Sequence, residues 1–276
     1  MVDVSLYGAK PGRRITLRDL QQATLRGERW PMLTTYDAMT ARIFDDAGVP
    51  ALLVGDSAAM VVYGYDSTIP VTVEELIPLV RAVVRGSSTA LVVADLPFGS
   101  YQASVAQALE TASAFMKDCG AQAVKLEGGA AVLPQVEALV SAGIPVIGHL
   151  GLTPQSVNLL GGYRVQGRAE QGDVLMRDAK ALEAVGASAV VLEVIPAALA
   201  AKVSDLLTIP TIGIGAGPDV DAQVLVWQDL LGLGAGPTPK FIDPYVNLRA
   251  IAQEGVERWV ADVRSGEYPQ PHHAYA

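Results

Sequence analysis

The sequence predicts an α/β protein built as a closed (β/α)8 barrel. Two observations predict it: eight short apolar segments that end in polar or glycine-rich residues, and stretches of helical periodicity between them. Eight strand–helix units within about 230 residues favour a closed barrel over an open doubly wound sheet, the other fold that such units form. The length of 276 residues suits one barrel or two modest domains.

The apolar segments are rich in Val, Ile, Leu and Ala and do not alternate with polar residues, as in parallel strands buried on both faces. They span residues 31–37, 49–56, 89–97, 120–129, 143–151, 186–194, 210–217 and 223–230. Segments 120–127 and 186–193 are near copies that both end in glutamate. Similar packing explains their shared apolar core, but burial does not call for a carboxylate at the end.

Helical periodicity is clearest in residues 104–119, where apolar residues recur at i, i+3, i+4 and i+7. Ser104 and Gln107 are spaced as a capping box, and Gly120 is placed as a terminator. Residues 133–140 and 175–185 repeat the pattern before a glycine. A strand followed by a helix, repeated along the chain, predicts a parallel sheet with right-handed crossovers.

Composition excludes several classes of protein. A net charge of −9 lacks the basic footprint of a nucleic-acid-binding protein. The single cysteine, Cys119, cannot form an intramolecular disulfide and favours a reducing compartment. Residues 138–163 contain no Asp, Glu, Lys or Arg, but prolines and glycines interrupt them too often for a membrane-spanning helix. The N-terminus has no apolar signal region, so we expect a cytoplasmic protein.

We expect residues 1–276 to form a single domain, with an N-terminal extension over about 1–28 and a flexible C-terminal tail over about 266–276. The tail is Pro-rich, and its two histidines, His272 and His273, are expected to be solvated.

Polar side chains stand at the carboxyl ends of the predicted strands, which open on one face of a barrel. They are Asp37, Asp56, Ser57, Asp95, Lys125, Glu127, His149 and Glu193. Carboxylates gathered with one lysine repel one another unless a cation compensates their charge. Hard oxygen ligands without a thiol suit Mg²⁺ better than zinc. Each aspartate could instead cap the helix that follows its strand.

Lys125 and Glu127 lie two residues apart on one strand, so both side chains point into the barrel if the register holds. They could form a structural ion pair, or the lysine could stabilise an oxyanion of a substrate. Glu193 follows an apolar run that would favour its acting as a proton acceptor, although a capping or salt-bridged glutamate is the alternative. For His149, a metal ligand, a substrate contact and a core histidine remain open.

Two loops bear on function. The glycine-rich segment 213–218 lacks the spacing of a phosphate-binding loop and is better explained as a tight strand–helix turn. The connection 151–168 is longer than an ordinary barrel loop and is a candidate lid.

At these residues the sequence resembles the ketopantoate hydroxymethyltransferase family. The resemblance rests on 33-LTTYDAMTA-41, 53-LVGDSAAMVVYGYDST-68, 94-ADLPFGSY-101, 124-VKLEGG-129, 148-GHLGLTPQS-156, 161-GGYRVQGR-168, 190-VVLEVIP-196 and 212-IGIGAG-217. The motifs span about 180 residues in the order of the family. Many relatives have Leu-Gly-Met where Ala58, Ala59 and Met60 stand here, which affects a loop beside the site.

The resemblance implies a (β/α)8 barrel of the phosphoenolpyruvate/pyruvate-binding type. It implies transfer of a hydroxymethyl group from 5,10-methylenetetrahydrofolate to 3-methyl-2-oxobutanoate through a Mg²⁺-stabilised enolate, giving 2-dehydropantoate for pantothenate. Carried over by motif, Asp56 and Asp95 would bind one Mg²⁺ per subunit, with Glu127 in or next to the metal shell.

For the substrate, the resemblance implies that Asp56, Ser57, Asp95, Lys125 and His149 contact the 2-oxo acid, and that Glu193 accepts the proton. It also implies a homo-oligomer, a decamer in the family.

Two alternatives remain. A different Mg²⁺-dependent enzyme on this barrel, of the phosphoenolpyruvate mutase or isocitrate lyase kind, would act on 2-oxo acids without folate. A catalytically silent barrel would serve as a binding protein, although the complete set of acidic residues speaks against it.

Overall fold

The computed structural model describes residues 5–7, 13–234, 236 and 238–275. The chain forms two compact units, Met1–Val226 and Trp227–Ala276, where the sequence predicts one domain over residues 1–276.

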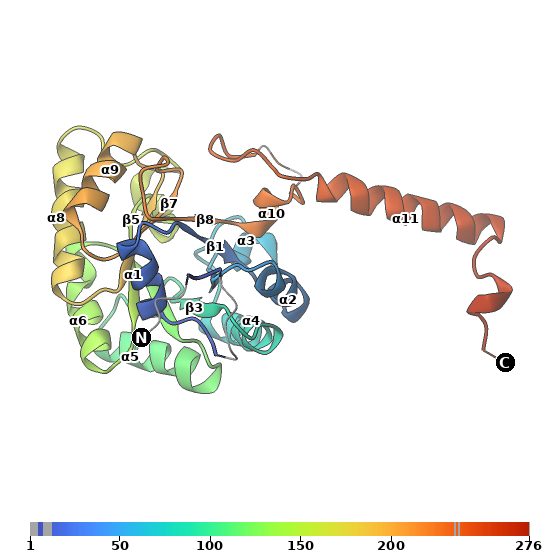
Figure 1. Cartoon of the computed structure of the whole chain (residues 1–276), viewed down its shortest axis with the longest axis horizontal. Coiled ribbons are helices and arrows are strands. Elements are labelled where there is room, and N and C mark those ends of the chain that lie inside the picture. Colours follow the sequence, from blue (N-terminus) through green and yellow to red (C-terminus); the bar gives the residue numbers. More distant parts are fainter. Residues whose placement is uncertain (1–4, 8–12, 235, 237, 276) are drawn as a thin grey trace. The chain divides into compact units, whose positions relative to one another are not determined.

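The first unit is a closed barrel of parallel strands in the order β1 to β8, as predicted (Figure 1). The strands are β1 Trp30–Thr34, β2 Ala51–Val54, β3 Leu91–Asp95, β4 Ala123–Glu127, β5 Val146–Gly151, β6 Ala189–Glu193, β7 Thr211–Ile214 and β8 Ala222–Leu225. Six of them lie within the predicted segments, and β1 and β8 each begin one residue before theirs. The eighth segment, 223–230, was wrong in its second half, because β8 ends at Leu225 and Trp227–Leu230 form the short helix α10.

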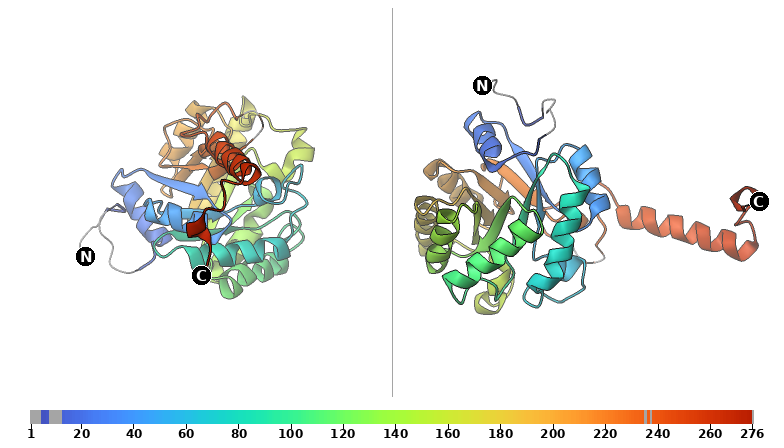
Figure 2. Two further views of the ribbon diagram at one scale, coloured as in Figure 1. Left: turned by 90° about the vertical axis from the view of Figure 1, so that its right-hand side faces the viewer. Right: turned by 90° about the horizontal axis from the view of Figure 1, so that it is seen from below.

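Helices cover the outside of the barrel (Figures 1 and 2). They are α2 Ala38–Asp46, α4 Val73–Gly86, α5 Val105–Ser113, α6 Leu133–Ser141, α8 Glu170–Ala184 and α9 Ala197–Leu206. The short helices α3 Ala58–Val61 and α7 Val157–Leu160 lie in the connections that follow β2 and β5. Shorter turns lie at η1 Ala114–Asp118, η2 Ala130–Val132 and η3 Pro154–Ser156.

The predicted helix over 104–119 is interrupted. It is α-helical to Ser113 and then widens into the π-helical turn η1, which ends beside buried Cys119. The predicted capping box forms only in part. Ser104 Oγ accepts from Gln107 N at 3.1 Å, but the Gln107 side chain accepts from Ala103 N instead of returning to Ser104.

The helix α1, Leu17–Leu25, packs at the amino end of the barrel, within the segment expected as an N-terminal extension. Its buried residues Leu17, Leu20 and Ala23 share one apolar cluster with the first residues of several strands. That cluster includes Trp30, Ala51, Leu91, Ala123, Ala189 and Ala222. The helix therefore seals the end of the barrel opposite the carboxyl ends of the strands.

The second unit contains α10, the 18-residue helix α11, Leu248–Ser265, and the short turn η4, Pro271–His273. The sequence analysis did not predict α11. Within this unit, Trp259 of α11 stacks edgewise on Tyr268 with ring centroids 6.4 Å apart. His272 and His273 are exposed, as expected. Within the described residues, no helix combines the length and apolarity that crossing a membrane requires.

We predict that Leu20→Ala lowers the free energy of unfolding by about 2–5 kcal/mol, because Leu20 is fully buried in the cluster that α1 builds. Leu25→Ala on the same helix is the matched control. Leu25 is 70% exposed, so its loss should change stability by no more than about 0.5 kcal/mol. Urea denaturation of both variants measures the difference, and equal effects would contradict a sealing role for α1.

Candidate active site

The carboxyl ends of four neighbouring strands bring most of the predicted site residues together. Asp95 ends β3, Lys125 and Glu127 lie on β4, His149 lies on β5 and Glu193 ends β6. The register pairs Asp95 with Lys125 and Glu127 with His149. Asp56 follows β2, and it is buried together with Asp95, Lys125, Glu127 and His149.

Asp95 and Lys125 form the most enclosed ion pair at the carboxyl ends of the strands, which we call the mouth of the barrel. Lys125 Nζ donates to both carboxylate oxygens of Asp95 at 2.7 Å, and the two side chains are 6% and 1% exposed. The backbone N–H of Asp56 donates to Asp95 Oδ2 at 3.2 Å, which joins β2 to the pair. Asp95 and Lys125 stand at paired positions of adjacent strands, so each charge compensates the other for the hydration lost on burial.

His149 lies between two glutamates. Its Nδ1 is 3.4 Å from Glu127 Oε1, and its Nε2 is 3.1 Å from Glu193 Oε2. These contacts are not aligned as hydrogen bonds, so they act as ion pairs when the ring is protonated. Glu193 has an 18% exposed side chain, against 3% for Glu127, and is therefore the more accessible of the two carboxylates.

Burial and mutual repulsion change the charges of this cluster. Desolvation, with the nearby Glu127 charge, raises the pKa of Asp56 to about 6. Desolvation also raises the pKa of Asp95 to about 6, even though Lys125 opposes the shift.

The two basic groups respond in the opposite sense. Burial alone would lower the pKa of Lys125, but the surrounding carboxylates outweigh burial and raise it above its usual value. Burial and Lys125 act to lower the pKa of His149, while Glu127 and Glu193 raise it to about 9. The cluster thus holds its cations charged and still has more carboxylates than cations.

Of two further residues predicted at strand ends, Ser57 lies near the cluster and Asp37 does not. Ser57 is close to the mouth, where its hydroxyl shares a 2.8 Å hydrogen bond with that of buried Tyr36. Asp37 does not reach the cluster. It is exposed, and its carboxylate caps α2 by accepting from the backbone N–H groups of Met39 and Thr40 at 2.8 and 2.9 Å. The expectation that all strand-end carboxylates share one mouth was therefore wrong for Asp37.

Sequence reasoning missed two residues of the cluster, Gln155 and Tyr101. The Gln155 side chain donates to Asp56 Oδ2 at 2.9 Å, and its backbone N–H donates to Glu127 Oε2 at 3.0 Å. Tyr101 O–H lies 2.8 Å from Gln155 Oε1. Gln155 belongs to the candidate lid 151–168, and its position after a proline in a loop carries no signal of its own.

The loop 151–168 also reaches across to α3, because the Tyr163 hydroxyl contacts Met60 Sδ at 3.8 Å. Partial burial raises the pKa of Tyr163, with contributions from the charges of Asp56, Glu193 and Glu127. The loop begins at Gly151, whose φ is +95° and whose position would place a Cβ 2.2 Å from Glu193 O. Glycine there lets Leu152 N donate to Glu193 O at 2.8 Å and anchors the loop to β6.

Residues 14–271 match the model of the family described as ketopantoate hydroxymethyltransferase. The chain belongs to this family.

Curated family members are similar along almost the whole chain. The 3-methyl-2-oxobutanoate hydroxymethyltransferase of Frankia alni is 64% identical, over 98% of this chain and 91% of that protein. The protein of the same name from Thermobifida fusca is 62% identical, over 99% of this chain and 97% of that protein.

Solved structures confirm the barrel type. A phosphonopyruvate hydrolase solved with oxalate and Mg²⁺ aligns with a TM-score of 0.60 at 14% identity, covering 95% of this chain and 92% of that one. A 2,3-dimethylmalate lyase of the phosphoenolpyruvate mutase/isocitrate lyase superfamily aligns with a TM-score of 0.58 at 17% identity, covering 94% and 93%. At these identities the likeness concerns the fold alone.

The family implies a metal, and the donor set of this mouth fits a hard cation in part. Asp56, Asp95 and Glu127 offer buried oxygens, and Glu127 Oε1 has no hydrogen-bond partner among the described residues. However, no three His, Cys, Asp or Glu side chains within the described part of the chain are arranged to hold an ion. These carboxylates therefore suit an ion such as Mg²⁺, which binds one or two protein carboxylates and completes its coordination shell with water or substrate oxygens.

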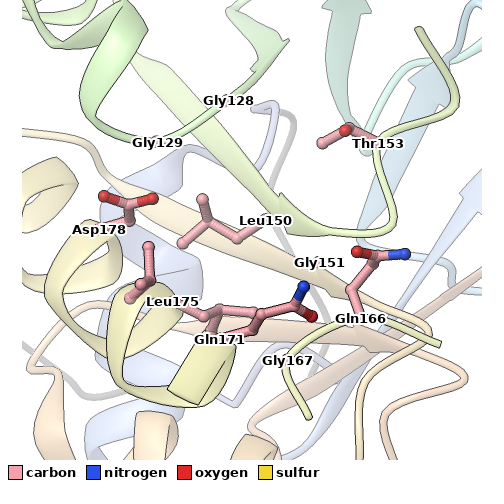
Figure 3. A pocket seen from close by; sticks show the side chains of 11 residues that line it. Gly128, Gly129, Leu150, Gly151, Thr153, Gln166, Gly167, Gln171, Leu175 and Asp178 are labelled. Atoms are coloured by element: carbon pink, nitrogen blue, oxygen red, sulfur yellow. The ribbon is translucent and has the colours of Figure 1, made fainter. Parts of the chain in front are cut away.

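A pocket of about 270 Å³ lies beside the cluster (Figure 3). Gln171, Leu175 and Asp178 on α8 form one wall, and Leu150 with the turn at Gly128 forms another. Asp178 Oδ1 accepts from Ala130 N at 3.3 Å, so this carboxylate supports the start of η2. None of the predicted site residues lines the pocket.

We predict that Lys125→Met lowers the free energy of unfolding of the metal-free protein by about 3–5 kcal/mol, because it leaves Asp95 buried without its cation. Lys180→Met is the control. Lys180 pairs with Glu183 on the surface with a 47% exposed side chain, so its loss should cost about 1 kcal/mol or less. Guanidinium denaturation in a chelating buffer compares them, and a similar loss in both variants would refute the central role of the buried pair.

Proposed function

We propose that this protein transfers a hydroxymethyl group from 5,10-methylenetetrahydrofolate to 3-methyl-2-oxobutanoate, giving 2-dehydropantoate in pantothenate biosynthesis. Membership of the ketopantoate hydroxymethyltransferase family supports the reaction. The observation that carries the proposal is the convergence of Asp56, Asp95, Lys125 and Glu193 at one end of the barrel. A 2-oxo acid that must lose a proton requires a metal site, a cation for its oxyanion and a base.

Asp56 and Asp95 would hold one Mg²⁺ per subunit, with Glu127 in or next to its shell. Their hard oxygens and the excess of buried carboxylates support this assignment. When bound, Mg²⁺ draws electron density from the keto group of the oxo acid and acidifies the hydrogen on C3.

Glu193 would accept that proton. Its carboxylate is more exposed than those of Asp95 and Glu127, so a substrate in the mouth can reach it. His149 contacts Glu193 Oε2 and would fix the direction of the carboxylate, and it would also contact the oxo acid.

Lys125 would stabilise the enolate oxygen that forms as the proton leaves. Its ammonium group is held by Asp95, which fixes its position before the substrate binds. Ser57 would contact the oxo acid from the β2 side, where Tyr36 orients its hydroxyl. The one-carbon unit gains a bond to C3 and a bond to the oxygen of water, while its two bonds to folate nitrogens break. The protons released from C3 and from water end on those nitrogens, which gives tetrahydrofolate.

We further propose a cytoplasmic homo-oligomer, a decamer by analogy with the family. In α11, the apolar side chains Ile251, Val256 and Trp259 are each more than half exposed, which supports contact with another copy.

We predict that Glu193→Gln leaves binding of 3-methyl-2-oxobutanoate within a few-fold of wild type but slows Mg²⁺-dependent deuterium exchange at C3 by about 10²–10⁴-fold. Proton NMR in D₂O measures this exchange without folate. Asp37→Asn is the control, because Asp37 stands at a strand end but only caps α2, and asparagine caps equally well. Undiminished exchange in Glu193→Gln would remove Glu193 from the role of base.

We also predict that turnover of the oxo acid requires 5,10-methylenetetrahydrofolate. The barrel is shared with lyases and mutases, so the alternative reaction is carbon–carbon cleavage or rearrangement of a 2-oxo acid without folate. Product analysis with and without the folate separates the two. Cleavage products in its absence would favour a lyase, and failure to bind both Mg²⁺ and the oxo acid in calorimetry would favour a silent barrel.

A further inference from the structure

Gln155 lies in η3, within the loop that follows β5, yet its side chain is only 4% exposed. It contacts two carboxylates from different strands, Asp56 after β2 and Glu127 at the end of β4. The 99 positions that separate Gln155 from Asp56 show that this contact depends on the closed barrel.

The carboxamide of Gln155 is held at both ends. Its Nε2 donates to Asp56 Oδ2 at 2.9 Å and to Leu96 O at 3.0 Å. Its Oε1 accepts from Tyr101 O–H at 2.8 Å and from Gln102 Nε2 at 3.2 Å. Because Leu96 O can only accept and Gln102 Nε2 can only donate, the orientation of the amide is fixed.

The same residue holds Glu127 through its backbone. Gln155 N donates to Glu127 Oε2 at 3.0 Å, while Glu127 Oε1 is buried without a hydrogen-bond partner in the described part of the chain. One oxygen of each carboxylate is therefore occupied by Gln155. The other oxygen of each, Asp56 Oδ1 and Glu127 Oε1, accepts no hydrogen bond from Gln155 and can face a metal ion. Glu127 Oε1 also lies 3.4 Å from His149 Nδ1, so the ion would share this oxygen with the imidazole ring.

We propose that Gln155 is a positioning residue that holds one oxygen of Asp56 and one of Glu127, presents their other oxygens to the metal ion, and so couples the loop 151–168 to metal binding. The proposal rests on the proposed function, because it needs the magnesium site. Partners that hydrogen-bond to metal-binding carboxylates reduce their freedom before the ion arrives, and losing such a partner typically weakens metal binding about 10–100-fold.

Coupling to the loop follows from reciprocity. If the loop must be in place for Gln155 to orient the carboxylates, then an ion bound to those carboxylates must stabilise the loop by the same free energy. The loop is also tied to β6 at Glu193 O and contacts Met60 through Tyr163. Metal binding should therefore stabilise the whole loop 151–168 against opening, and not only the position of Gln155.

The first test uses Mn²⁺ alone as the probe, titrated into the full-length protein and followed by the EPR signal of the free ion. Gln155→Met keeps the length of the side chain and removes its hydrogen bonds. We expect its Mn²⁺ affinity to fall about 10-fold or more. Gln135→Met is the control, because Gln135 is buried and donates to Tyr101 O but has no hydrogen bond to a carboxylate. Its Mn²⁺ affinity should match that of the wild type.

Tyr101→Phe is the second variant and removes only the hydroxyl, which lies 2.8 Å from Gln155 Oε1 and also accepts from the backbone N–H of Glu127 at 3.1 Å. It should fold, since the ring remains, and should weaken Mn²⁺ binding less than Gln155→Met. If Gln155→Met fails to fold, this variant decides the matter, and wild-type affinity in Tyr101→Phe would then overturn the proposal.

Hydrogen exchange of the amides in 151–168 gives a second measurement. We expect Mg²⁺ to slow their exchange in the wild type and in Gln135→Met, but not in Gln155→Met. Equal Mn²⁺ affinity in the wild type and Gln155→Met would overturn the positioning role while leaving the magnesium site intact. Absence of Mn²⁺ binding in the wild type would overturn the proposed metal site itself, and this proposal with it.

Discussion

The excess of buried negative charge at the carboxyl end of the barrel is the constraint on which the rest of the site depends. Asp56, Asp95 and Glu127 are each about 5% exposed or less, Lys125 donates to Asp95, and the His149 ring lies 3.4 Å from Glu127. Carboxylates are expensive to desolvate unless each oxygen meets a donor or a cation. Neighbouring groups supply these donors. The backbone N–H of Asp56 donates to Asp95, the side-chain amide of Gln155 donates to Asp56, and the ring of His149 lies beside Glu127.

The same constraint gives neighbouring carboxylates different roles. Asp95 is held on both oxygens by Lys125, so it fixes the position of the ammonium group. Glu193 stands at the edge of the cluster, where it keeps an ion-pair partner in His149 and still meets solvent. Depth in the barrel thus separates the enclosed carboxylates from one that meets solvent, which is what the proposed base requires.

The sequence predicted the barrel because parallel strands buried on both faces leave continuous apolar runs, and glycines mark their ends. It predicted Asp56, Asp95, Lys125, Glu127 and Glu193 because polar residues at strand ends are conspicuous after such runs. It failed at Asp37, since a strand-end aspartate and a helix cap have the same local pattern, and only the exposed position of Asp37 separates them. It also missed Gln155, whose role arises from contacts with residues far away in the chain. The helix α11 was missed as well, because its apolar residues are not gathered into a buried stripe.

The packing of α1 against the amino ends of the strands has a consequence for the order of events during turnover. With that end filled by Leu17, Leu20 and Ala23, a ligand reaches Asp95 and Lys125 from the carboxyl ends of the strands. When two substrates enter at the same end of the barrel, binding and release of one depend on whether the other is bound. The molecule seated deepest must arrive first and its product must depart last, so the architecture of the barrel imposes an ordered kinetic sequence.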